Sequence, residues 1–502
     1  MKHKRRWILR SCLALLFCAG FAIGWWHGHK PLPAGLHIAG NLLETPTANL
    51  QLLTDRTAAD AYGRPLIEQQ IFDSTLALIA SSRDLLVLDY FLFNDHQGAL
   101  RDNQSAATAP RAYRTLSGEL RDALLARSRA EPALSILLLI DPINLGYGTR
   151  LTPEFDALRR AGIDVVPVNL DALRDSNPVW SGLWRLAIRW WAPSDGAGSL
   201  PNLLDSDGDG MRVGAFARLL NFKADHRKLV IAGDGSGSLT GIVSSANPHD
   251  ASSAHSNVGL RLHGPSLVPL LESALQIARL SGWRGNIDVP PTRAAAVSVD
   301  KASVSRVAIS TEGATREALV QRIEATQRGD LIDLAMFYLT DRQVIRALLE
   351  ASSRGVAVRA ILDPNKDAFG HEKNGVPNRQ VASELVTASE GAIRVRWYRT
   401  HGEQFHAKLV AISSGGQLWL TLGSANLTSR NLGDYNLEAN VMVETPLGGP
   451  LAGEVNAWFE SLWTNRVGNG TEYTADLDVY ADSSQGRYWL YRLMEASGMS
   501  TF

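Results

Sequence analysis

Residues Phe405 to Glu438 read FHAKLVAISSGGQLWLTLGSANLTSRNLGDYNLE and form the most informative segment of the chain. His406 and Lys408 stand two residues apart at the start of an apolar run. Because side chains alternate between the two faces of a strand, both project from one face if that run is a strand. A Ser-Ser-Gly-Gly turn follows, and a second apolar run returns toward Ser424 and Asn426. The stretch therefore predicts a hairpin that places an imidazole and an ammonium beside a hydroxyl and a carboxamide.

The same arrangement occurs once more, nearer the middle of the chain. His226 and Lys228 precede an apolar run, a Gly/Ser turn, and then Ser245 and Asn247. The separation of His from Asn is 20 residues in the later copy and 21 in the earlier one. A lone H-x-K occurs by chance in many proteins, whereas two copies with matched downstream spacing indicate one site that is built twice.

These paired stretches resemble the HxK...GSxN motifs of the phospholipase D superfamily, with both copies in one chain. Each motif Asn is followed ten residues later by another, Asn257 in the first copy and Asn436 in the second. The sequence departs from the family pattern where an Asp is expected five residues after the Lys, because Gly233 and Ser413 stand there. Ser244 also replaces the leading Gly of the first GSxN. The resemblance implies an α/β fold of two pseudo-symmetric phospholipase D-like domains, each a mixed sheet flanked by helices.

The residues of the two copies can open a phosphodiester without a metal ion. One imidazole attacks phosphorus and a second protonates the departing alkoxide, while lysines and neutral donors stabilise the phosphoryl oxygens. We therefore expect no metal and no cofactor, and we expect the hydroxyls of Ser245 and Ser424 to bind substrate. The expected catalytic residues are His226, Lys228, Asn247, His406, Lys408, Asn426 and Glu438.

The resemblance also implies different roles for the two imidazoles. Glu438 lies twelve residues after Asn426, where the superfamily often has an acidic residue that orients a catalytic histidine, and Gly259 is its first-half counterpart by position. A carboxylate fixes the tautomer of the imidazole and makes it more basic. By the resemblance, His226 is the nucleophile and His406 the general acid and base.

The order of predicted elements repeats along the chain. A helical pattern over Leu66–Ala80 precedes an apolar strand near 84–93, and a helix around Thr315–Gln327 precedes a strand near 331–339. Helices that alternate with buried strands predict parallel strand pairs in an α/β fold. The predicted organisation is an N-terminal segment 1–26, a first domain 40–288 with a Trp-rich insertion 172–211, a linker 289–305, a second domain 306–464 and a C-terminal tail 465–502.

Two features of the first domain have open interpretations. The insertion holds Trp180, Trp184, Trp190 and Trp191, which could lie at a membrane interface, form an acyl-chain wall, or simply pack over the sheet. The run 205–210 matches the first half of an EF-hand loop, but Phe216 occupies the twelfth position, so a polar turn is expected rather than a calcium site.

The N-terminus predicts export of the rest of the chain. Basic residues crowd positions 2–10, and a largely apolar run follows from Cys12 to Trp26. The basic flank stays in the cytoplasm, so we expect an uncleaved anchor in the inner (cell) membrane with the globular part on the periplasmic or extracytoplasmic side. A cleaved signal peptide, with secretion to the periplasm, is the alternative. Cys12 and Cys18 are the only cysteines, so the globular part has no disulfide and no thiolate site.

The composition of the chain limits the classes of molecule that we expect it to bind. The 502 residues carry a formal net charge of −1, which gives no general attraction to polyanions, so no nucleic acid partner is expected. We expect a phospholipid substrate, a membrane, and a monomer, since both motif copies lie in one chain. The predicted function is a phosphodiesterase or phosphatidyltransferase that acts through a phosphohistidine, similar to phospholipase D or cardiolipin synthase. An exported nuclease of the same superfamily and a non-catalytic lipid-binding protein are the alternatives.

Overall fold

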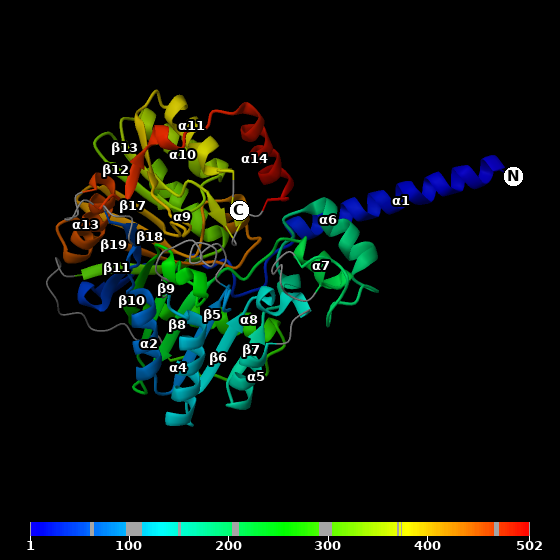
Figure 1. Ribbon diagram of the computed structural model, residues 1–502, viewed down its shortest axis with the longest axis horizontal. Helices are drawn as coiled ribbons and strands as arrows, with labels where there is room; N and C mark the ends of the chain where they lie inside the picture. Colours follow the sequence, from blue (N-terminus) through cyan, green and yellow to red (C-terminus); the bar gives the residue numbers. More distant parts are fainter. Residues whose placement is uncertain are drawn as a thin grey trace.

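The computed structural model describes residues 2–60, 65–96, 113–148, 152–202, 210–290, 304–368, 371–372, 374–465, 471–500 and 502. Most of the linker predicted at 289–305 and of the half EF-hand run 205–210 lies outside the described residues. Two large mixed sheets dominate the chain, and each is covered on one face by helices (Figure 1). This is the predicted α/β architecture of two similar halves.

The first half is built on a seven-stranded sheet. Its strands β5, β6 and β7 pair in parallel, whereas β8, β9, β10 and β2 join antiparallel, so the sheet is mixed. Helices α2 (Ile71–Ser81), α4 (Leu116–Ala130) and α5 (Pro153–Arg160) pack on its outer face. In sheet order the strands are β2 (Leu50–Thr54), β10 (Val258–His263), β9 (Leu239–Ser244), β8 (Lys228–Gly233), β5 (Leu85–Tyr90), β6 (Ser135–Ile140) and β7 (Asp164–Pro167).

The second half repeats this plan in a nine-stranded sheet. Strands β12, β13 and β16 are parallel, and the hairpin β17–β18 continues the sheet antiparallel. Helices α9 (Gly313–Glu324), α10 (Arg342–Ser353) and α11 (Asn378–Ala388) cover its outer face. In sheet order the strands are β1 (Leu43–Pro46), β11 (Val304–Thr311), β19 (Ala439–Pro446), β18 (Gln417–Gly423), β17 (Lys408–Ser414), β12 (Leu331–Met336), β13 (Ala357–Leu362), β16 (Ile393–Tyr398) and β20 (Thr474–Asp476).

Local sequence explains why these helices form where they do. In α10 the side chain of Asp341 caps the first turn by accepting bonds from the backbone N–H groups of Gln343 and Val344. Buried residues then recur at helical spacing on one face, including Val344, Leu348 and Ala351. The prediction of a helix from Leu66 is wrong for its first residues, because β4 (Pro65–Glu68) pairs there with β3 (Arg56–Ala59) in a short hairpin.

Two segments lie in a different half from the one that their sequence position suggests. Strand β1 precedes the first sheet in the sequence, yet it pairs with β11 at the edge of the second sheet. Strand β20, from the predicted tail, adds the opposite edge strand by pairing with β16. The N-terminal segment and the tail are therefore tied to the second half by β-ladders, which sequence periodicity does not reveal.

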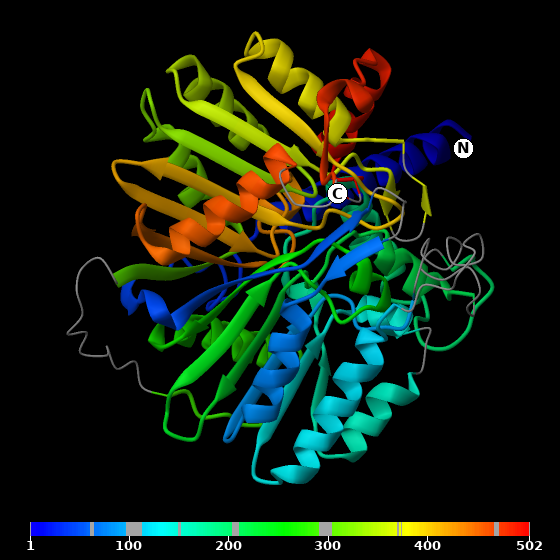
Figure 2. The same cartoon turned by 60° about the vertical axis from the view of Figure 1, so that its left-hand side comes forward.

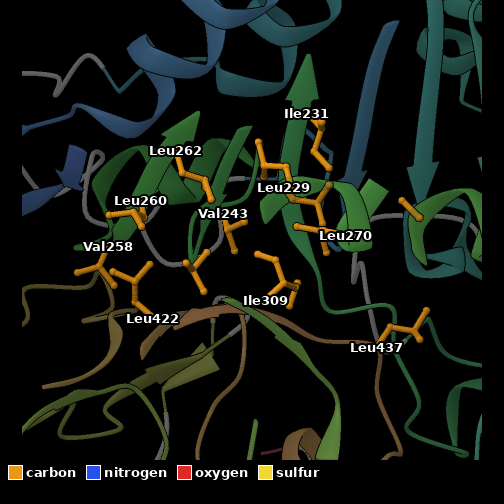
Figure 3. Packing of buried hydrophobic residues seen from close by; sticks show 14 of the residues in the cluster. Leu229, Ile231, Val243, Val258, Leu260, Leu262, Leu270, Ile309, Leu422 and Leu437 are labelled. Carbon is orange, nitrogen blue, oxygen red and sulfur yellow. The ribbon is translucent and has the colours of Figure 1, made fainter. Parts of the chain in front are cut away.

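The inner faces of the two sheets meet in one apolar core. Val243 and Leu260 of the first sheet lie opposite Leu422 of the second, with Ile309 beside them (Figure 3). Helices α8 (Val268–Leu280) and α13 (Pro450–Thr464) contribute to the same core. Figure 2 shows the two sheets on either side of this contact. Extensive apolar burial between the halves makes them one packed unit.

A buried ion pair also joins the halves. The guanidinium of Arg227 lies 2.7 Å from the carboxylate of Glu312, and neither side chain is exposed to solvent. Arg227 also donates to Ser273 Oγ at 3.0 Å. Since Arg227 comes from the first half and Glu312 from the second, the pair fixes their relative position.

Replacing Arg227 should therefore destabilise the whole fold. Arg227→Met leaves the Glu312 carboxylate buried without its cation, and breaking a buried pair in this way costs about 3–5 kcal/mol. The midpoint of chemical denaturation of the solubilised protein measures the loss. Arg306→Met is the matched control, because Arg306 is 55% exposed and its partner Glu444 keeps a second cation, Arg322; it should change stability by less than about 1 kcal/mol. Equal midpoints for the two variants would contradict the argument.

Candidate active site

The two H-x-K motifs meet where the halves join. Lys228 and Lys408 are the first residues of β8 and β17, and each histidine stands two residues before its strand. The backbone N–H of His226 donates to Leu437 O at 2.9 Å, and that of His406 donates to Ser256 O at 2.8 Å. Each motif is thus held by backbone from the opposite half. All four motif side chains are buried, with the histidines 7–8% exposed and the lysines 1%.

Each imidazole is oriented through its Nδ1 atom. His226 Nδ1 lies 3.0 and 3.1 Å from the two carboxylate oxygens of Glu438, and His406 Nδ1 lies 3.2 Å from Asn257 Oδ1. A ring that donates from Nδ1 to an oxygen keeps the lone pair of its Nε2 free when it is neutral. In that tautomer, Nε2 of each histidine is free of these contacts.

The structural counterpart of Glu438 is Asn257, and the expected match with Gly259 is wrong. Strand β10 places Gly259 opposite Ser244, whereas β19 places Asn440 opposite Gly423, so Glu438 and Asn257 occupy equivalent places. The loop that leads to Glu438 is two residues longer than the loop that leads to Asn257, which shifts any count made along the sequence. For the same reason Asn436 does not correspond to Asn257.

Ser245 and Ser424 hold the partners of the imidazoles rather than facing a substrate. The hydroxyl of Ser245 donates to Asn257 Oδ1 at 3.1 Å and accepts from the Val258 N–H. Ser424 makes the same pair of bonds with the Glu438 carboxylate and the next N–H. Both serines are fully buried. Both serines thus orient the partners of the imidazoles, and substrate binding by their hydroxyls stays a prediction.

The ammonium group of each lysine lies over an aromatic ring that the motif spacing did not reveal. Lys228 and Lys408 donate to the carbonyl oxygens of the histidines in their own motifs, the second at 2.9 Å. The ammonium of Lys228 lies 5.0 Å from the ring centre of Phe91, and that of Lys408 lies 5.0 Å from that of Phe337. Each ring also stands edge-on to the histidine of its motif. The motif spacing gave no sign of these rings, which come from the residues just past β5 and β12.

The two site asparagines differ in how they are used. Asn247 Oδ1 accepts from the backbone N–H of Leu92 at 3.1 Å, so it braces the segment beside Phe91. Asn426 Oδ1 is buried and has no hydrogen-bond partner among the residues that the structure describes. Because a buried amide oxygen without a partner is costly, Asn426 Oδ1 is suited to accept a hydrogen bond from a hydroxyl of a bound ligand.

Two buried aspartates support the strand entries. Asp141 Oδ2 accepts from the Asp225 N–H at 2.6 Å, and Asp363 Oδ2 accepts from the Phe405 N–H at 2.7 Å. Both follow the second parallel strand of their sheet and begin an Asp-Pro pair, so the repeat in the sequence was a signal of their shared role. They brace the backbone immediately before each histidine.

Burial dominates the electrostatics of the site. It lowers the pKa of His226 to about 4, against the opposing effect of the Glu438 carboxylate. It also lowers the pKa of His406 well below its usual value, with the Lys408 charge acting in the same direction. The pKa of Lys228 falls to about 7 through burial, although Glu438 and nearby aspartates oppose the shift. Burial thus disfavours positive charge on these side chains, and a bound anion would favour it.

Comparison with known proteins gives one family match and several similar structures. Residues 319–463 match the family described as "Cardiolipin synthase, PLD-like domain", and no curated protein matches the chain. Phosphatidylserine synthase from Haemophilus influenzae Rd KW20 has a similar structure, with a TM-score of 0.55 at 11% identity over 91% of this chain and 95% of its own. The phospholipase D family member Nuc from Salmonella typhimurium aligns over 34% of this chain and 97% of its own, with a TM-score of 0.26 and 18% identity. The family match thus covers much of the second half of the chain, and the likeness to the synthase shows a shared fold.

Removing the carboxylate that holds His226 should slow turnover with little effect on the fold. Glu438→Gln keeps the size of the side chain but loses the charge that raises the His226 pKa, so we expect a loss of about 10²–10⁴-fold in kcat/KM. The acid limb of the pH–rate profile should also move to lower pH. Hydrolysis of a chromogenic phosphodiester measures both effects.

Glu444→Gln is the matched control for that substitution. Glu444 is a buried carboxylate on the same strand, β19, but it pairs with Arg306 and Arg322, away from the site. Its replacement should leave the rate unchanged. A Glu438→Gln protein that is as active as this control would show that the carboxylate plays no part in the reaction.

Anion binding should weaken as pH rises through about 7. Lys228 is cationic below its pKa of about 7 and neutral above it, so a divalent oxyanion loses one partner as pH rises. Linkage gives a fall in affinity of up to about tenfold per pH unit for one such lysine. Tungstate is a suitable probe because its charge is constant from pH 6 to 9, and calorimetric titration measures the affinity.

Two lysine variants separate the site from the rest of the protein. Lys228→Met should weaken tungstate binding at pH 6 and flatten its pH dependence. Lys30→Met should change neither, although burial also lowers the pKa of Lys30, to about 8. An affinity for tungstate that is constant from pH 6 to 9 in the unmodified protein would refute the assignment.

Proposed function

We propose that the protein is a membrane-anchored enzyme that cleaves or transfers the phosphodiester of phospholipids through a phosphohistidine intermediate. The observation that carries this proposal is the meeting of His226 and His406, each held at Nδ1, with two buried ammonium groups at the junction of the halves. The charges of the two imidazoles are close enough to influence one another. A site of this kind has the groups that a two-step phosphoryl transfer needs.

In the proposed first step, His226 Nε2 attacks phosphorus and the bond to the leaving alkoxide breaks. The positive charge that develops on His226 is stabilised by Glu438, at 3.0 Å from Nδ1. His406 gives its Nε2 proton to the departing oxygen. Lys228 and Lys408 neutralise the phosphoryl oxygens, and Asn426 adds a neutral contact.

In the proposed second step, water or an alcohol attacks the phosphohistidine while His406 takes up its proton. The N–P bond breaks, and His226 returns to its neutral form. The different partners of the imidazoles favour this division of roles, because a carboxylate stabilises a cation on His226 whereas the neutral amide of Asn257 does not. The negative charge of the bound substrate favours protonation of His406. Because the pKa of His406 is low, the protonated ring then gives up its proton readily.

Several features favour a phospholipid as the substrate. The second half matches a family described by cardiolipin synthase, and the net charge of −1 gives no general attraction to nucleic acid. Helix α1 (Lys2–His29) contains a stretch, His3–His29, that is long and apolar enough to cross a bilayer, with a mean hydropathy of 1.8. In this proposal α1 is an uncleaved anchor in the inner membrane, and the globular part lies on the extracytoplasmic side. Both motif copies lie in one chain, so a monomer suffices.

Product analysis tests the proposal. Incubation with radiolabelled phosphatidylglycerol in excess EDTA should yield phosphatidic acid if water is the acceptor, or cardiolipin and glycerol if a second lipid is the acceptor. The chelator should not matter, since lysines and amides supply the neutralising groups. His226→Ala should abolish both turnover and a trapped phosphoryl adduct. His406→Asn should stop turnover but permit the adduct to accumulate where the leaving group is good enough to depart unprotonated.

The controls distinguish chemistry from folding and from substrate choice. If thermal unfolding of the two histidine variants is unchanged, they keep the fold. Their loss of activity is then a defect of catalysis. Activity that appears on single-stranded DNA or RNA and on no phospholipid would overturn the lipid assignment in favour of an exported nuclease. Lipid binding without turnover of any phosphodiester would overturn the proposed catalysis and identify a non-catalytic lipid-binding protein.

A further inference from the structure

The base of α1 packs directly against the Trp-rich insertion. Gly20, Gly24 and Gly28 are spaced four residues apart on one side of α1 and face helix α6 (Pro178–Leu183). A Cβ at Gly24 would lie 1.9 Å from Pro178 O, and one at Gly182 would lie 2.1 Å from Gly20 O. Backbones that approach this closely are typical of small-residue contacts between membrane helices.

Polar contacts fix this junction. The backbone N–H of Asp175 donates to His27 O at 2.9 Å, which satisfies a carbonyl in the last turn of α1. The Asp175 side chain in turn accepts from Arg185 at 2.6 Å and Lys223 at 2.7 Å, and all three side chains are buried. These contacts hold the insertion against the base of α1. The solvent or lipid that surrounds the base of α1 is therefore also in contact with the insertion.

The insertion exposes large apolar side chains beside its contact with α1. Val179 is 83% exposed, Trp190 75% and Trp191 67%, while Trp184 is buried. Trp25 and Trp26, near the same end of α1, are also more than half exposed. Burial within the protein therefore applies to Trp184 and not to the exposed pair.

Helix α14 (Gln485–Ser497), in the C-terminal tail, carries apolar side chains on two sides. Its outward face presents Trp489, Leu490 and Leu493, which are 64%, 46% and 67% exposed. On its inward side Tyr491 and Met494 pack on the core of the second half, and Glu495 bonds to the same half. The outward face of a helix in water is typically polar, so the exposed Trp and Leu side chains of α14 indicate a different environment.

The two apolar surfaces adjoin one another around α1. A Cβ at Gly498, just after α14, would lie 1.8 Å from Ser176 O, just before α6. Figure 1 shows α14 and α6 on the side of the molecule from which α1 projects. We define the apolar collar by its exposed side chains, which are Val179, Leu183, Trp190, Trp191, Trp489, Leu490 and Leu493.

We propose that the apolar collar lies in the interface of the bilayer that α1 crosses, so that α6 and α14 rest on the membrane. Continuity with α1 identifies the bilayer as the occupant, because the collar surrounds the point where a spanning helix must leave the lipid. Exposed Trp and Leu on one face of a short helix are the groups that enter the headgroup and acyl boundary, to a depth of about 5–10 Å. This inference rests on the proposed anchoring by α1.

The collar would also set the active site close to the lipid surface. Glu495 on α14 accepts from the backbone N–H of Ser429 at 2.9 Å and from the Thr340 hydroxyl at 2.6 Å. Ser429 follows Asn426 by three residues. The helix that rests on the bilayer in this proposal thus braces the loop that leaves the site.

Site-directed spin labelling of the full-length protein in lipid nanodiscs tests this placement. The chain has only two cysteines, so Cys12→Ser with Cys18→Ser gives a background for single labels at Leu183→Cys, Leu490→Cys and Leu493→Cys. Cys12→Ser alone leaves Cys18 as a label within α1. Ala126→Cys, at an exposed position on α4, is the aqueous control. The accessibility of each label to oxygen and to a water-soluble nickel complex measures its depth.

We expect accessibility at positions 183, 490 and 493 to shift from nickel toward oxygen, as at Cys18, while position 126 remains open to nickel. Lipid contact at Cys18 with aqueous labels on the collar would overturn this inference and leave the anchor intact. An aqueous Cys18 would overturn both. Spin–spin broadening at 490 and 493 in singly labelled protein would show that a second copy covers the collar instead, which also refutes the proposal.

Discussion

The whole site depends on four backbone hydrogen bonds that cross between the halves. His226 N–H and Leu437 N–H donate at 2.9 and 3.0 Å to Leu437 O and Ala224 O, and the mirror pair joins Ser256 to residues 404 and 406 at 3.0 and 2.8 Å. These short parallel bridges are too far apart in sequence to form before the halves dock. Each half therefore completes the other half's strand entry, and neither histidine is in place without both.

Burial of charge is the second constraint. Two ammonium groups and two imidazoles lie in a site that contains one directly paired carboxylate, Glu438, which receives bonds from His226, Ser424 and Asn431. Desolvation lowers the pKa of both lysines, and the mutual repulsion of the two adds to the effect on Lys408. A phosphodiester anion relieves that repulsion as it enters, so electrostatics favour the ligand that the chemistry requires.

Much of the arrangement could be predicted from sequence, because motif spacing and strand periodicity are local. The pairing of His and Lys on one strand face, the duplication and the α/β class all follow from short patterns around His226 and His406. Strand register across the sheets is not local. The equivalence of Asn257 and Glu438 depends on loops of different length, and the rings of Phe91 and Phe337 reach the lysines through neighbouring strands. For the same reason the sequence did not reveal that β1 belongs to the second sheet or that α14 exposes its apolar face.

The difference between Glu438 and Asn257 has a meaning for how such a site can evolve. In a symmetric homodimer made from one motif copy per chain, both imidazoles necessarily have the same partner, and their basicities can diverge only after a ligand binds. A single polypeptide with two copies is free of that restriction, because each copy mutates separately. Here a carboxylate supports one ring and an amide the other, at 3.0 and 3.2 Å. Joining the copies thus permits permanent specialisation of two groups that an oligomer of identical subunits would keep alike.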